Sequence, residues 1–417
     1  MADPSGAPLL LDTARADPAE AAACLEEAWG RQRLVALAGP GQQGDLAQAL
    51  GGATGEMAAL VRFGAAVVVG SGGSAGGPHW CLQPLAHLQA SAEATAAWLV
   101  SLGLEPAACL HLDPLPLHHV SGLLPLVRAR HWGGTLHWLA PSLMRRPQDL
   151  PQLCPLPRDR PVLLSLVPTQ LARLMASPEA TEWLAACAVI WVGGAGLPAP
   201  LAAAARRARL PLAPCYGATE TAAMVCALPP QRFLAGAEGC GEPLNDVALR
   251  LDGDTGAVEV RCGRLSPGRL VAGRLLPLPL QPGDWWRSGD AGRLGAEGVE
   301  LLGRLDGALH SGGETVFPER LEERLQVQAE LAGAGLDALL LLARPDPEWG
   351  EHLVVLVRPK QEDEGEELLG VLQAITAAWP PAERPRHWHL CPSLAYNAAG
   401  KWERGRWQSW LDSLEAF

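Results

Sequence analysis

Between residues 17 and 207 the chain alternates short apolar runs with longer amphipathic stretches. Short apolar runs of this kind are typical of buried strands, and the stretches between them have the spacing of surface helices. Strands are expected at residues 65–69, 108–112, 135–139, 161–165 and 189–192, and helices at residues 17–32, 84–102, 120–129, 169–176 and 199–207. This order predicts an α/β fold, a sheet with helices on both faces.

The pattern changes after about residue 217. Short runs separated by Gly, Asp and Pro are typical of antiparallel strands, and they occur at residues 247–251, 257–261 and 268–276. A second α/β unit is expected after Asp306, with a helix at residues 318–330 and strands at residues 338–342 and 352–357. The acidic run 361–367 is interpreted as a solvated loop. Two domains are therefore predicted, residues 1–305 and residues 306–417.

Composition excludes several classes of function. A chain of 417 residues exceeds one ordinary core and fits two or three folding units. The formal net charge of -12 argues against nucleic acid or an anionic membrane as partner, since both attract basic surfaces. The ten cysteines form no CxxC pair, so neither a zinc site nor a disulfide framework is predicted. No signal peptide or membrane span is evident, and a cytoplasmic protein is expected.

Lys401 is conspicuous because lysine is rare in this chain. Only Lys360 and Lys401 among the 33 basic side chains are lysines, and Lys401 follows Gly400 in a loop-like stretch. A compact ammonium on a flexible stem can reach into a crowded site and bridge a phosphate and a carboxylate. An ordinary surface lysine is the alternative interpretation.

A Gly/Ser-rich stretch, residues 70–78, follows the first of these predicted strands. Backbone N–H groups and hydroxyls in such a loop can surround a phosphate, although a plain turn is the alternative. The stretch is not a Walker loop, because no Gly-Lys-Ser/Thr follows it.

Two later segments carry groups suited to a nucleotide. The ring of Tyr216 can stack on a base, the hydroxyl of Thr219 can bind a phosphate and the carboxylate of Glu220 can hold Mg²⁺. A strand end followed by a helix N-cap at Thr219 is the alternative. Asp290, expected at a strand end, could accept both ribose hydroxyls, with Arg304 fixing the same sugar or its phosphate. The alternative for this pair is an ordinary salt-bridged turn.

Together and in this order, these segments resemble the adenylate-forming superfamily of acyl-CoA synthetases, adenylation domains and firefly luciferases. The resemblance covers nearly the whole chain. Residues 71–78 match the superfamily's phosphate loop, residues 216–220 its Tyr-Gly-x-Thr-Glu motif and residues 288–290 its ribose motif. Residues 303–318 match its hinge segment, and residues 400–401 match its lysine motif. Within the superfamily, residues 115–122 and 165–171 are most similar to the 2-succinylbenzoate–CoA ligases. Two departures concern the phosphate loop: His79 replaces a lysine, and Ala75 stands where a hydroxyl is common.

The resemblance implies a large N-terminal AMP-binding domain, made of mixed α/β subdomains and a small β-rich subdomain, and a small mobile α+β C-terminal domain. It implies an acid–CoA ligase that forms an acyl-adenylate and then a CoA thioester, with Mg²⁺ as cofactor and ATP and CoA as co-substrates. Lys401 would be catalytic, His119 would gate the acyl tunnel, Glu220 would hold the metal and Asp306 would be the hinge. The nucleotide and pantetheine contacts would be Ser71, Gly72, Gly73, Ser74, Gly76, Gly194, Ala195, Gly196, Tyr216, Gly217, Thr219, Asp290, Arg304, Gly312 and Gly313. Polar anchors for 2-succinylbenzoate would be Ser165, Thr169 and Gln170.

Three other functions stay open at this stage. The chain could be a ligase for another aryl or medium-chain acid, with the same nucleotide site. It could be a stand-alone adenylation domain that passes its acyl group to a carrier protein in trans. It could also be a degenerate nucleotide-binding protein, which the changes at Ala75 and His79 allow. Self-association into a homo-oligomer is left open.

Overall fold

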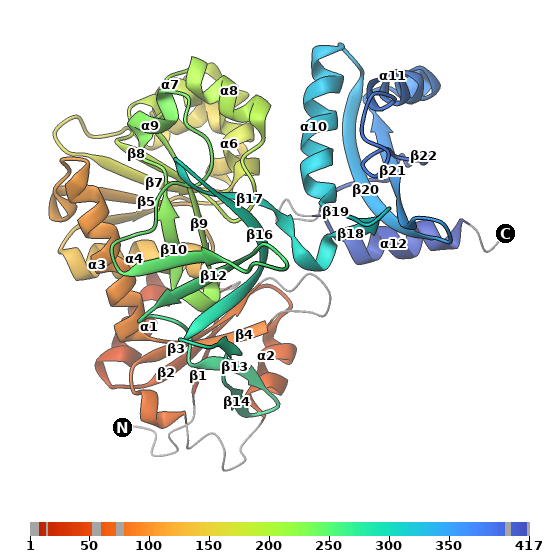
Figure 1. Ribbon diagram of the computed structural model, residues 1–417. Helices are drawn as coiled ribbons and strands as arrows, with labels where there is room; N and C mark the ends of the chain where they lie inside the picture. The colour runs from red at the N-terminus through yellow and green to blue at the C-terminus, as the bar shows by residue number, and fades with distance from the viewer. Residues whose placement is uncertain (1–7, 14–15, 52–59, 72–78, 397–401, 415–417) are drawn as a thin grey trace.

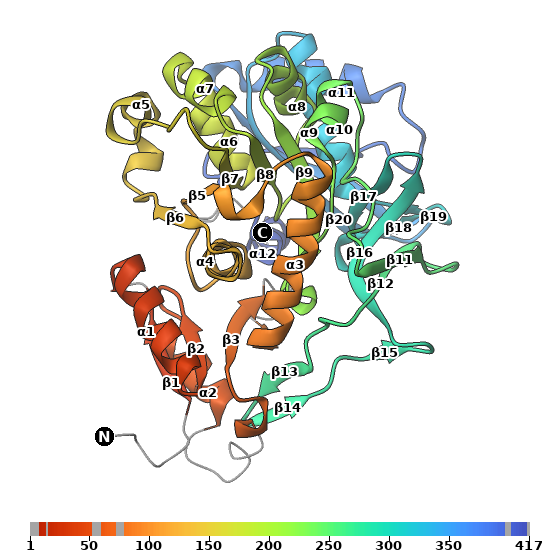
Figure 2. The same cartoon turned by 90° about the vertical axis from the view of Figure 1, so that its left-hand side faces the viewer.

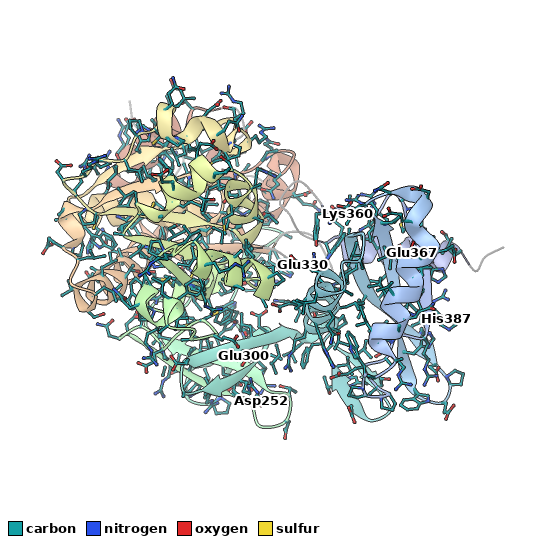
Figure 3. All side chains as sticks on the ribbon, turned by 90° about the horizontal axis from the view of Figure 1, so that it is seen from above. Asp252, Glu300, Glu330, Lys360, Glu367 and His387 are labelled. Carbon is teal, nitrogen blue, oxygen red and sulfur yellow. The ribbon has the colours of Figure 1, made fainter. Side chains whose placement is uncertain are left out.

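The computed structural model describes residues 8–13, 16–51, 60–71, 79–396 and 402–414. Two lobes are visible in Figure 1, a large one and a small one that contains the elements after β17 (Gly298–Arg304). Seen from above in Figure 3, Glu300 lies in the large lobe, whereas Lys360 and His387 lie in the small one. In the described part of the chain no helix is long and apolar enough to cross a membrane.

The first sheet of the large lobe joins two distant parts of the sequence. Its order is β1-β2-β3-β4-β13-β14, with β1, β2 and β3 parallel and the other pairs antiparallel. The helices α1 (Pro18–Gly30) and α2 (Gln43–Leu50) pack against it. The strands are β1 (Leu9–Asp12), β2 (Leu34–Ala38), β3 (Ala66–Ser71), β4 (His79–Pro84), β13 (Gly268–Val271) and β14 (Arg274–Leu276). The run 268–276 is thus a hairpin that extends the N-terminal sheet.

The second sheet confirms the predicted α/β alternation. Its order is β10-β9-β8-β7-β5-β6, parallel except for β10. Its strands are β5 (Leu110–Asp113), β6 (Thr135–Trp138), β7 (Val162–Leu166), β8 (Val189–Val192), β9 (Leu212–Ala218) and β10 (Ala223–Ala227). Its helices are α3 (Leu85–Ser101), α4 (Val120–Trp132), α5 (Leu150–Leu153), α6 (Pro168–Met175), α7 (Pro178–Ala185), α8 (Ala199–Arg207) and α9 (Pro230–Leu234). Figure 2 shows α3 and α4 running between the two sheets, whose cores both include side chains from α3.

A third, antiparallel sheet connects the large lobe to the small one. It consists of β11 (Val247–Leu251), β12 (Ala257–Cys262), β15 (Leu280–Gln281), β16 (Trp285–Gly295) and β17. The expectation that Asp290 stands at a strand end is wrong, because β16 continues through it as one arm of a long hairpin with β17. The sequence did not predict a continuous strand here, because Ser288, Gly289 and Asp290 are poor strand formers. Pairing of β16 with neighbouring strands on both of its edges overrides that preference.

The small lobe has its own sheet and core. The strands β18 (Leu309–Ser311), β19 (Glu314–Val316), β20 (Leu336–Asp346), β21 (Gly350–Pro359) and β22 (His387–Leu390) carry the helices α10 (Pro318–Leu331), α11 (Gly365–Thr376) and α12 (Arg404–Ser413). The expectation of a loop over residues 361–367 is wrong for its last part, because α11 begins at Gly365. Buried Leu368 and Leu372 anchor this helix, and acidic residues in its first turn suit the helix dipole.

Candidate functional site

Three side chains predicted to hold a nucleotide meet at one place. Tyr216 comes from β9, Asp290 from β16 and Arg304 from the end of β17. The Tyr216 hydroxyl donates to Oδ2 of Asp290 at 2.7 Å, and Nη1 of Arg304 lies 3.3 Å from Oδ1 of Asp290. Asp290 and Arg304 meet because they are directly opposed in the β16–β17 pair. Both carboxylate oxygens of Asp290 are thereby oriented.

Burial strengthens this arrangement. Tyr216 is 7% exposed, and burial together with the charge of Asp290 raises the pKa of its phenol well above the usual value. The hydroxyl therefore keeps its proton and remains a donor to the carboxylate. Gly217, the next residue, has no room for a side chain, because a Cβ there would lie 2.2 Å from the carbonyl oxygen of Ala223 on β10.

Arg304 also contacts the predicted hinge. Its Nε and Nη2 donate to the two carboxylate oxygens of Asp306 at 3.0 and 3.1 Å. These two carboxylates raise the pKa of Arg304, with the bond to Asp306 as the largest cause. One guanidinium thus connects Asp290 in the large lobe with the residue at which the predicted C-terminal domain begins.

The structure describes the predicted phosphate loop only at its two ends. Ser71 ends β3 and pairs with His79 at the start of β4. Gly72, Gly73, Ser74, Ala75 and Gly76 lie outside the described residues.

Thr219 and Glu220 lie in a buried 3₁₀ turn, η6 (Thr219–Thr221), which packs against β3 and β4. Nε2 of Gln83 donates to the Thr219 carbonyl at 2.6 Å and fixes the turn on β4. Oε1 of Glu220 lies 2.8 Å from Nη2 of Arg269, and the Glu220 side chain is 7% exposed. Sequence reasoning missed Arg269, because only the pairing of β13 with β4 brings it here.

The charge and setting of Glu220 fit a magnesium ion that arrives with phosphates. Among the described residues, no group of three or more His, Cys, Asp and Glu could hold a metal ion. Mg²⁺ usually binds one or two protein carboxylates together with substrate phosphates, so one carboxylate at this position is sufficient.

The predicted base-binding segment follows β8 at the carboxyl edge of the parallel sheet. Gly194, Ala195 and Gly196 are exposed there, and Gly194 has a φ of +80°, which favours glycine. Ligands bind in this kind of position in open α/β sheets. Gly312 and Gly313 lie in the small lobe instead, at the β18–β19 turn, where a Cβ on Gly312 would lie 2.7 Å from the ring of Trp349.

His119 is exposed and immediately precedes α4. Its ring centroid is 4.4 Å from that of His118. His118 is buried, with Nδ1 2.9 Å from the Thr13 hydroxyl, and burial lowers its pKa to about 4. The neutral ring of His118 therefore packs against the ring of His119, next to the start of α4.

The three predicted substrate anchors differ in their surroundings. Gln170 caps the start of α6, with its Oε1 accepting from the Val167 backbone at 3.1 Å. Thr169 is exposed in the first turn of the same helix. Ser165 is half-buried in β7, directly opposite Trp191 of β8, and it faces α3 and α4.

Arg128 is a charged residue that sequence reasoning missed. It lies on the otherwise apolar part of α4 and is 4% exposed. Its guanidinium carbon is 4.9 Å from the ring centroid of Trp191. Within the described residues no carboxylate lies within ion-pair distance of it, and its Nε has no hydrogen-bond partner. Desolvation lowers the pKa of Arg128 to about 10.

Polar groups gather around Arg128. His111 and Asp113 of β5 are buried, and each has a side-chain atom without a partner in the described part of the chain. Burial lowers the pKa of His111 to about 3 and raises that of Asp113, so both favour their neutral forms. Ser165 and Trp191 belong to the same face of the sheet. The available signal was an Arg directly after the apolar residues 123–127, which a packed core would exclude unless an anion compensates it.

Lys401 lies outside the described residues. On either side of that segment, Tyr396 and Trp402 stack with centroids 3.8 Å apart. Nη2 of Arg404, two residues further on, lies 2.9 Å from both carboxylate oxygens of Glu322 on α10.

Comparison with known proteins agrees with this fold. The 2-succinylbenzoate–CoA ligase of Enterococcus faecalis is 27% identical over 361 residues, covering 84% of this chain and 70% of the relative. That of Salmonella typhimurium is 29% identical over 303 residues, covering 71% and 59%. The o-succinylbenzoate CoA synthetase MenE of Bacillus subtilis, in complex with the acyl-adenylate intermediate OSB-AMP, superposes with a TM-score of 0.67 at 22% identity, covering 82% of this chain and 68% of the other. In its unliganded form the TM-score is 0.70 at 18% identity, covering 92% and 88%.

A family model described as AMP-binding enzyme matches residues 66–273. These residues include both edges of the predicted phosphate loop, the Tyr216–Glu220 segment and Arg269. With the curated relatives and the shared fold, this match identifies the chain as a member of the AMP-binding enzyme family, the adenylate-forming ligases.

Proposed function

We propose that this protein is an ATP-dependent acid–CoA ligase that converts 2-succinylbenzoate to 2-succinylbenzoyl-CoA, a step of menaquinone or phylloquinone synthesis. The curated relatives bear the name of this activity. The meeting of Tyr216, Asp290 and Arg304 supports the nucleotide half of the proposal.

The observation that carries the substrate class is the buried Arg128, which has no counter-ion in the part of the chain that the structure describes. An arginine in an apolar setting costs several kcal/mol unless an anion compensates it. 2-Succinylbenzoate has two carboxylates, a ketone and a ring. One carboxylate would react with ATP, and the other would pair with Arg128 while Trp191 contacts the ring. Ser165, on the same face, would donate to the ketone or the carboxylate.

In the first half-reaction, a carboxylate oxygen of the acid attacks the α-phosphorus of ATP, and pyrophosphate leaves. Two anions must approach each other, so catalysis is chiefly positioning and positive charge. Lys401 would contact the carboxylate and an α-phosphate oxygen, Ser71, Ser74 and Thr219 would bind phosphates, and Asp290 with Arg304 would hold the ribose. Glu220 would bind Mg²⁺, which when present neutralises phosphate charge.

In the second half-reaction, the sulfur of CoA attacks the acyl carbonyl and AMP leaves. Rotation of the small lobe about Asp306 would withdraw Lys401 and bring Gly312 and Gly313 to the pantetheine chain. His119, at the start of α4, would control access to the acyl carbon.

The test is to incubate the protein with ATP, Mg²⁺, CoA and 2-succinylbenzoate and to look for the thioester by mass spectrometry. Benzoates and fatty acids form a parallel panel, and Lys401→Ala is the control. A succinylbenzoyl-CoA product that disappears in the variant is expected. A thioester from another acid alone would reject the substrate, adenylate release that does not depend on CoA would favour an adenylation domain, and ATP binding without turnover would favour a degenerate protein.

A further inference from the structure

Arg269 is a charged residue near Glu220 with no role in the proposed reaction steps. It lies on β13, directly opposite Cys81 of β4 in the antiparallel pair. β4 begins two residues earlier at His79, which pairs with Ser71 at the end of β3. Directly opposed residues of antiparallel strands point to the same face of a sheet. Arg269 therefore belongs to the face that carries Ser71, His79 and Cys81, at the edge of the predicted phosphate loop.

This face is covered by η6, which carries Glu220. The ion pair between Nη2 of Arg269 and Oε1 of Glu220 connects β13 to the turn at 2.8 Å. Cys81 lies beneath the pair, and burial together with the charge of Glu220 raises the pKa of its thiol. Cys81 is therefore a neutral neighbour and adds no charge to the pair.

The guanidinium is only partly used by this contact. The Arg269 side chain is 34% exposed, and within the described part of the chain its buried Nε has no hydrogen-bond partner. Arginine has five N–H donors in a planar fork that suits the oxygens of a phosphate. Of the described residues on this face of β3, β4 and β13, Arg269 alone carries a permanent positive charge.

We propose that Arg269 is a binding residue for the phosphate chain of ATP. In the ligand-free protein it neutralises Glu220. When the nucleotide and its metal ion bind, Glu220 turns to the metal and the guanidinium turns to a phosphate oxygen, so the pair exchanges partners without leaving a buried charge alone. This inference rests on the proposed function, because it takes ATP as the ligand of this site.

The experiment measures ATP binding by calorimetry with the full-length protein, without acid or CoA, once in EDTA and once with Mg²⁺. The variants are Arg269→Gln, Arg269→Lys, Glu220→Gln and the double variant Arg269→Gln/Glu220→Gln. Arg31→Gln is the control, because it removes one arginine charge from an exposed pair with Glu27 at the end of α1. Thermal melting of each variant reports folding, and the double variant guards against the misfolding that an unpaired buried Glu220 could cause.

In EDTA we expect Arg269→Gln to weaken ATP binding roughly 10- to 100-fold, as is usual for the loss of a charged hydrogen-bonding partner. Arg269→Lys should retain part of the affinity. Glu220→Gln should bind metal-free ATP at least as tightly as the wild type, because a negative charge is gone and Arg269 no longer has a competing partner. The double variant should be as weak as Arg269→Gln.

Two results would overturn the inference. Folded Arg269→Gln that binds metal-free ATP like the wild type would mean that Arg269 only neutralises Glu220. Equal weakening of Glu220→Gln and Arg269→Gln in EDTA would mean that the intact pair is needed only for the local fold. A wild-type protein that binds no ATP under either condition would instead reject the proposed function.

Discussion

Replacing Arg128 by Met should make the protein more stable and its acid binding weaker. Met has a similar reach, fills irregular space and lacks the charge. Arg128 is 4% exposed and has no ion-pair partner among the described residues, so removing it leaves no partner carboxylate stranded. Its neighbour Asp113 already favours the neutral form, because burial raises its pKa.

The magnitude follows from the pKa of Arg128, which falls from 12.5 to about 10. At roughly 1.4 kcal/mol for each pKa unit, holding the charge in the folded state costs about 3 kcal/mol. The contact with Trp191 returns about 1–2 kcal/mol of this when desolvated. Arg128→Met should therefore raise the free energy of unfolding by about 1–2 kcal/mol at neutral pH. The lost carboxylate contact should raise KM for 2-succinylbenzoate roughly 10- to 100-fold.

Urea unfolding measures the first effect, and steady-state kinetics with 2-succinylbenzoate and with benzoate measures the second. Benzoate lacks the second carboxylate, so its KM should change little. Arg130→Met is the matched control, because Arg130 lies on the same helix with a side chain that is 71% exposed. A destabilised variant, or an equal change of KM for both acids, would show that Arg128 is a structural cation and would refute the reasoning.

Three further predictions concern other parts of the molecule. His118 has a pKa of about 4 in the folded protein, so the unfolded chain takes up a proton first as the pH falls. The free energy of unfolding should therefore decrease by up to about 3 kcal/mol between pH 6.5 and pH 4. His118→Gln should remove this decrease, as measured by thermal melting at a series of pH values. Tyr216→Phe removes one of two contacts to Asp290 and should raise KM for ATP roughly 5- to 20-fold without changing KM for the acid, whereas an equal change in both would argue for a general packing defect. Asp306→Pro should spare ATP–pyrophosphate exchange and slow thioester formation, and equal loss of both half-reactions would reject the hinge.

Local patterns in the sequence were sufficient for the sheet-and-helix alternation and for the nucleotide motifs. The apolar runs at residues 65–69 and 189–192 correspond to β3 and β8, because a short β-branched run can bury both faces only inside a sheet. The sequence was also sufficient to propose Tyr216, Asp290 and Arg304 as nucleotide contacts, because each lies in a segment that resembles a family motif. Their mutual contact was not, because it depends on the pairing of strands distant in the sequence.

Only the tertiary structure decided which charges face one another. Arg269 lies 49 positions after Glu220 in the sequence and contacts it because the β13–β14 hairpin joins the N-terminal sheet. No local sequence pattern encodes the register of that pairing. Arg128 has no counter-ion among the described residues because three separate segments pack around it, which depends on how helix α4 rotates against β5 and β8. Periodicity in a sequence reports the face that a residue prefers, whereas the partners on that face are set by long-range packing.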